Sequence, residues 1–128
     1  MSYHFSKRLD LPFDQAVARV IEALKREGFG VLTDIDVRAT IKSKLGEEFR
    51  AYRILGVCNP PLAFRALQLE DKIGTMLPCN VIVQEHADGN VEISAVDPVA
   101  SMQAIHNPGL AEVAKEVQSR LKRAIEGL

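Results

Sequence analysis

The chain has 128 residues, of which 47% are hydrophobic and 26% are charged, and its formal net charge is −1. This composition is typical of one globular domain spanning residues 1–128, long enough to bury a core without disulfides or a metal. The balanced charge argues against nucleic acid or an anionic membrane surface as the main partner.

No apolar run approaches the roughly 20 residues that a membrane-spanning helix needs. The first residues also lack the apolar core of a signal peptide. We therefore expect a cytoplasmic protein with no membrane partner. In that compartment both cysteines are expected to be reduced thiols.

The chain begins with a predicted strand and helix. Residues 3–9 alternate in polarity, which indicates a strand with Tyr3, Phe5 and Leu9 on its buried face. Pro12 opens a helix, where its missing N–H does no harm. An apolar stripe at helical spacing follows, and a glycine after two cationic residues ends the helix.

A second strand is predicted at residues 30–35, with Val31, Thr33 and Ile35 on one face. Asp36 caps a short helix that a glycine ends. A third strand follows at residues 49–57.

The C-terminal half predicts a helix from Pro60 to about residue 72 and two strands at 77–86 and 91–96. The turn Ala87-Asp88-Gly89-Asn90 makes these two strands a hairpin. Asn107-Pro108 starts a last helix with an apolar stripe of more than four turns. The element order predicts an α+β fold with helices packed on one face of a mostly antiparallel sheet.

The two cysteines stand in related settings, Val57-Cys58-Asn59-Pro60 and Pro78-Cys79-Asn80-Val81. If the third and fourth strands pair antiparallel, the end of one meets the start of the other. We then expect Cys58 and Cys79 to be close neighbours. Two close thiols can form a disulfide, share a soft metal, or act as nucleophile and resolving partner.

Activation of Cys58 is expected to be weak. The thiol precedes a predicted helix N-cap, Asn59, and a helix N-terminus lowers the pKa of a neighbouring thiol. However, Pro60 and Pro61 remove two amides that would hold an anion, and the Asn59 side chain can occupy the amide of Leu62. The alternative is that both cysteines are small buried hydrophobic residues.

The evidence for a metal site is weak, and no cofactor is predicted. Structural zinc normally takes four ligands, and Cys58 and Cys79 supply two. None of His4, His86, His106 or Glu85 stands at a recognised ligand spacing from them. Two cysteines from each chain of a dimer could complete a site, but each histidine alone is typical of a solvated surface residue.

The segments Tyr52-Arg53-Ile54-Leu55-Gly56-Val57-Cys58-Asn59-Pro60 and Leu77-Pro78-Cys79-Asn80-Val81-Ile82-Val83 carry a recognisable pattern. Together they resemble the family called domain of unknown function 302. The similarity extends over the whole chain, including Val96-Asp97-Pro98. The resemblance implies five strands arranged like one repeat of the TATA-binding protein (strand, helix, four strands, helix) and suggests a homodimer. It implies no activity and says nothing about DNA.

Two functional hypotheses follow. In the first, the chain is a thiol-dependent binding or redox module in which Cys58 and Cys79 work as a pair. Asn59 and Asn80 would orient the backbone there, and Glu85 would be an accessory acid. In the second, it is a structural or small-ligand-binding homodimeric domain without redox or catalytic chemistry, and the cysteines line the floor of a pocket under the short helices. No hydrolase, nucleotide or metalloprotease motif is present, so no enzyme class is predicted.

Overall fold

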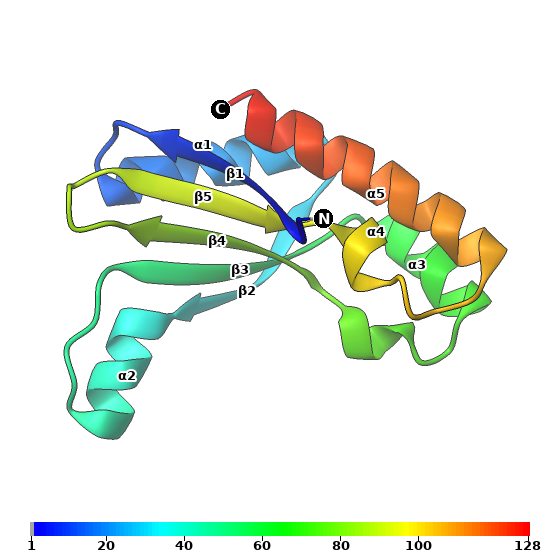
Figure 1. Cartoon of the computed structure of the whole chain (residues 1–128), viewed down its shortest axis with the longest axis horizontal. Coiled ribbons are helices and arrows are strands. Elements are labelled where there is room, and N and C mark those ends of the chain that lie inside the picture. The colour runs from blue at the N-terminus through cyan, green and yellow to red at the C-terminus, as the bar shows by residue number, and fades with distance from the viewer. Residues whose placement is uncertain (1) are drawn as a thin grey trace.

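The computed structural model describes residues 2–128, and its five strands form one sheet of order β1-β5-β4-β3-β2 (Figure 1). The strands are β1 (His4–Leu9), β2 (Gly30–Asp36), β3 (Tyr52–Cys58), β4 (Cys79–Glu85) and β5 (Val91–Val96). All neighbouring pairs are antiparallel. The predicted α+β class and five-stranded sheet are confirmed, whereas the likeness to a repeat of the TATA-binding protein stays a prediction.

Helices α1 (Phe13–Arg26) and α5 (Pro108–Glu126) pack side by side on one face of the sheet (Figure 1). Their apolar stripes meet the inward side chains of β3, β4 and β5 in the main core, as the helical spacing predicts. Several of these side chains are fully buried: Val20, Leu24, Leu55, Val81, Val83, Ile93 and Leu121.

A second apolar cluster lies beyond the end of the sheet, under α3 (Pro60–Leu69), the 3₁₀ helix η1 (Ile73–Met76) and the N-terminal half of α5. Its buried members are Leu62, Ala66, Ile73, Met102, Leu110, Val113 and Ala114. The predicted helix from Pro60 to about residue 72 is too long, because the backbone becomes extended at Glu70 and η1 follows. The short helix α4 (Pro98–Ser101) was not predicted.

Helix α2 (Val37–Leu45) projects from the sheet and buries none of its side chains (Figure 1). Both ends of the helix are at the residues predicted from the sequence. Asp36 accepts a 2.9 Å hydrogen bond from the Ala39 amide, and Gly46 ends the helix in a left-handed conformation with φ 70°. The caps therefore define this helix without any contribution from the core.

Two predictions about the strands are wrong. Tyr3 lies before β1 and is 72% exposed, so it does not belong to the buried face. In β2 the pairing shifts between Val31, which lies opposite Val57, and Thr33, which lies opposite Gly56. This bulge puts Val31 on the helix-covered face and Thr33 on the other, because one extra residue reverses the alternation of side chains.

Gly56 allows the start of β4 to approach β3 closely. A Cβ atom at this position would lie 2.6 Å from Cγ of Pro78 and would also collide with the side-chain oxygen of Thr33. Proline is a rigid ring, and Cys79 follows it directly, so the clash cannot be relieved without moving β4.

We expect Gly56→Ala to lower the free energy of unfolding by about 1–3 kcal/mol, the usual cost of overpacking. Urea denaturation measures this value. Gly30→Ala is the matched control in β2, because a Cβ there meets nothing within 4 Å. Equal unfolding free energies for the two variants would contradict this account of Gly56.

Candidate functional site

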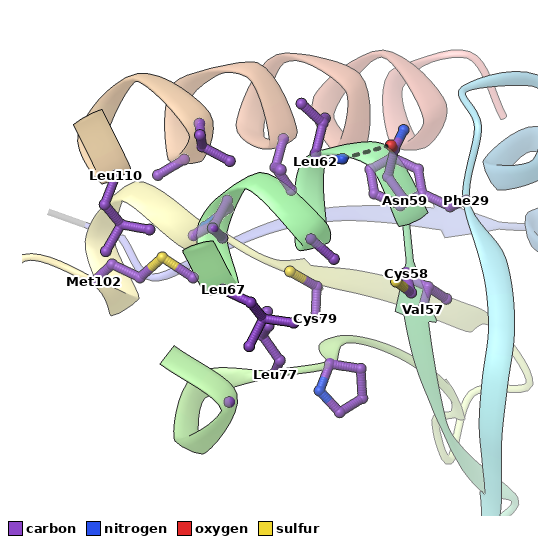
Figure 2. Close-up of a pocket in the computed structure, with 18 of the residues that line it drawn as sticks. Phe29, Val57, Cys58, Asn59, Leu62, Leu67, Leu77, Cys79, Met102 and Leu110 are labelled. Atoms are coloured by element: carbon purple, nitrogen blue, oxygen red, sulfur yellow. Dashed lines mark hydrogen bonds between the residues drawn. The ribbon is translucent and has the colours of Figure 1, made fainter. Parts of the chain in front are cut away.

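An apolar cavity of about 340 Å³ lies between the main core and the second cluster (Figure 2). Its walls come from α3, η1, α4 and the first half of α5, and its floor comes from the ends of β3 and β4. The side chains and backbone that line it are almost all apolar: Phe29, Leu32, Val57, Cys58, Asn59, Leu62, Ala63, Ala66, Leu67, Gly74, Leu77, Pro78, Cys79, Pro98, Met102, Leu110, Val113, Ala114 and Val117.

Three Asx-Pro pairs begin the three helices around this cavity. Asn59 accepts a hydrogen bond from the Leu62 amide at the start of α3, and Asn107 accepts one from the Leu110 amide at the start of α5. Asp97 accepts hydrogen bonds from the amides of Val99 and Ala100 in α4. Each proline occupies the first helical position, where its missing N–H leaves no partner unsatisfied.

The same three side chains also connect each helix to another element. Asn59 Nδ2 donates to the Glu27 carbonyl oxygen, 3.4 Å away, just after α1. Asn107 Nδ2 donates to the Leu69 carbonyl oxygen at the end of α3, at 2.9 Å. Gln118 of α5 donates to both carboxylate oxygens of Asp97, at 3.0 and 3.2 Å. The caps therefore link the elements that form the cavity walls.

Cys79 is a buried member of the cavity lining, with 7% of its surface exposed (Figure 2). Burial raises the pKa of its thiol to about 11, and Cys58 on the neighbouring strand adds a smaller contribution. Cys58 is half-buried, and burial raises the pKa of its thiol as well. Near neutral pH both groups are therefore neutral thiols, the weakly nucleophilic form.

The predicted pairing of Cys58 with Cys79 is wrong. In the β3–β4 ladder Cys79 lies opposite Val57, one residue before Cys58. Because successive residues of a strand point to opposite faces, the two cysteine side chains point away from each other. Both border the cavity because β3 ends and β4 begins at this point, but they form neither a disulfide nor a dithiol pair.

The other predicted site residues are dispersed. Asn59 is buried in the cavity wall, where its amide oxygen and nitrogen are both hydrogen-bonded. Asn80 is exposed and lines a hollow of mixed polarity on the sheet face that α1 and α5 do not cover. Glu85 ends β4 opposite Val91, at the other end of the strand from Cys79. Of the predicted residues, only Cys58, Asn59 and Cys79 meet at one site.

Within residues 2–128, no three His, Cys, Asp or Glu side chains gather closely enough to hold a metal ion. A site that shares cysteines across a dimer stays a prediction. In the same part of the chain, no helix is long and apolar enough to cross a membrane. The cytoplasmic location stays a prediction too.

Sequence reasoning missed most of the cavity lining, in particular Met102 and the part of the α5 stripe that begins at Leu110. A usable signal was present, because Asn59-Pro60, Asp97-Pro98 and Asn107-Pro108 repeat one pattern. Three such pairs predict three helix starts. They do not predict that the three helices surround one space.

A sequence model of the family described as "Domain of unknown function DUF302" matches residues 5–128. Among proteins with curated descriptions, none matches this chain. One similar solved structure is the crystal structure of an uncharacterized conserved protein DUF302 from Bacillus stearothermophilus. It is 30% identical, the alignment covers 98% of each chain, and the TM-score is 0.91.

We expect the two thiols of the native protein to react with Ellman's reagent at very different rates. At pH 8 a group with a pKa of about 11 is thiolate in only about one molecule per thousand, and Cys79 is also shielded from solvent. Cys58 should therefore react first, and Cys79 should react quickly only after unfolding in guanidinium. Cys58→Ser and Cys79→Ser assign the two phases. A fast native phase that is lost in Cys79→Ser would contradict this prediction.

Proposed function

Because the chain belongs to the DUF302 family, whose description names no activity, we propose from the cavity that this protein binds a small apolar molecule. The observation that carries the proposal is the apolar cavity of about 340 Å³ between the two hydrophobic clusters. This corresponds to the second hypothesis from the sequence, in which the cysteines line a pocket under the short helices.

The size and the lining of this cavity both suit a small molecule. Cavities that bind small molecules start at about 300 Å³ and are lined mainly by apolar side chains. The cavity has both properties.

The lining also restricts the chemistry of the ligand. Asn59 is the one lining residue with a polar amide side chain, and both of its polar atoms are already hydrogen-bonded. A charged or strongly polar group in the cavity would lose its hydration without gaining a partner there. The part of the ligand inside the cavity is therefore expected to be hydrocarbon.

Thiol redox chemistry has less support. The nucleophilic form of a cysteine is its thiolate. Burial raises the pKa of both cysteine thiols, so little thiolate forms near neutral pH. The β3–β4 register also directs the two side chains to opposite faces, so neither can resolve an intermediate formed on the other. In this proposal the Cys79 thiol acts as a small, soft part of the apolar wall.

We expect the uncharged fluorophore N-phenyl-1-naphthylamine to bind the protein, with a rise in fluorescence that saturates near one probe per chain. Ala66→Leu should weaken this binding at least tenfold, because Ala66 lines the cavity and the larger side chain fills it. The unfolding free energy of this variant should be unchanged or higher, since filling a void removes its cost.

Ala16→Leu makes the same change at a fully buried position of the main core, outside the cavity. It should lower the unfolding free energy by about 1–3 kcal/mol through overpacking. Probe binding by the folded protein should be unaffected. A wild-type protein that leaves the fluorophore unbound, or an Ala66→Leu variant that binds it equally well, would overturn the proposed function.

We further propose that two copies of the chain associate through the sheet face that α1 and α5 leave uncovered. The strand registers align Ile35, Ile54 and Ile82 in one row across β2, β3 and β4 on this face. Next to that row projects α2, a nine-residue helix with no buried side chain. Isolated helices of this length are marginal in water, so packing against a second copy would stabilise it.

Light scattering during size-exclusion chromatography should therefore give the mass of a dimer. Ile54→Lys should shift the protein toward the monomer, because it places a charge in the centre of the apolar row. Phe64→Lys is the control, since Phe64 is 63% exposed on α3, away from this face. A monomer at tens of micromolar wild-type protein would refute the dimer and leave the ligand proposal intact.

A further inference from the structure

A second, smaller hollow of about 180 Å³ adjoins the apolar cavity. Three residues, Met102, Leu110 and Ala114, line both spaces. The remaining residues around the smaller hollow are Val99, Gln103, Ile105, Ala111 and Lys115. The two spaces are therefore adjacent and share Met102, Leu110 and Ala114 as part of their walls.

Met102 is the adaptable residue among these three. It lies beside Leu110 at the end of the cavity away from Asn59 (Figure 2). Its side chain is 9% exposed and belongs to the second apolar cluster. Methionine is unbranched and has three rotatable side-chain bonds, so it can change rotamer where a branched residue cannot. A ligand that occupied both spaces would require Met102 to change rotamer.

Lys115 is the single charged residue among those that line either space. It follows Ala114 on α5, which lines both spaces, and it is an exposed lining residue of the smaller hollow. Among the hydrogen bonds and ion pairs of residues 2–128, none involves the Lys115 ammonium group. A cation without a partner beside an apolar space is complementary to an anion attached to a hydrocarbon chain.

We propose that the ligand is a free fatty acid, an inference that rests on the proposed binding of an apolar molecule. The hydrocarbon chain lies in the large cavity and passes Met102 into the smaller hollow. The carboxylate reaches the surface, where it pairs with Lys115. The hydrocarbon supplies most of the affinity, because each buried methylene strengthens binding about fourfold, whereas an exposed ion pair adds far less.

The head group is tested by displacing bound N-phenyl-1-naphthylamine with dodecanoate and with 1-dodecanol. Both should displace the probe. Lys115→Gln should weaken the binding of dodecanoate about twofold to fivefold, which is the usual contribution of a surface ion pair. The binding of dodecanol should be unchanged. Lys122→Gln is the matched control, an exposed lysine on α5 that lies over the Phe5 ring and outside both spaces.

The position of the hydrocarbon chain is tested with fatty acids of increasing length. In the wild-type protein, affinity should rise from octanoate through dodecanoate by up to about fourfold per methylene. Ala111→Phe fills only the smaller hollow, because Ala111 does not line the large cavity. This variant should bind the fluorophore normally. Its affinity for fatty acids should stop rising at a shorter chain length than in the wild-type protein.

The outcomes separate the two proposals. If the fluorophore binds but Lys115→Gln has no effect on the ratio of dodecanoate to dodecanol affinity, the fatty-acid inference is overturned and the proposed function stands. The same holds if Ala111→Phe leaves the chain-length dependence unchanged. If the fluorophore does not bind the wild-type protein, the proposed function itself fails.

Discussion

Three helix caps connect the helices that surround the apolar cavity. Asn59, Asp97 and Asn107 each satisfy amides at the start of one helix and hydrogen-bond to a second element. An ordinary cap needs only the first of these contacts. The second contacts add hydrogen bonds between elements that the second apolar cluster also packs together. Polar interactions at the edges of the cavity and apolar packing therefore both position its walls.

The cysteines illustrate how a strand register decides chemistry. Two thiols near adjoining strand ends suggest a reactive pair, yet a shift of one residue in the ladder separates their side chains onto opposite faces. Gly56 is part of the same arrangement, since it lets Pro78 approach β3 just before Cys79. What remains is a buried thiol with a raised pKa in an apolar wall, a setting that favours packing and ligand contact over nucleophilic chemistry.

Local signals predicted most of the fold. The stripes of α1 and α5, the cap of α2 at Asp36 and the hairpin between β4 and β5 all depend on residues close in sequence, and all are present in the structure. The errors occurred where neighbouring residues do not carry the information. The bulge in β2 depends on the partner strand β3, and the end of α3 at Leu69 depends on how η1 turns back toward β4. Tyr3 fits an alternating pattern, but the strand begins one residue later.

The same distinction between local and long-range information applies to the site. The sequence by itself determined that helices start at Asn59 and Asn107, that α1 and α5 each present one apolar face, and that the charge is balanced. These properties follow from residue chemistry and short-range spacing. Only the tertiary structure decided that Cys79, Leu62 and Met102 border one cavity, and that Cys58 points away from Cys79. The reason is physical: a cavity is the space left between elements, and its existence depends on long-range contacts that no single segment encodes.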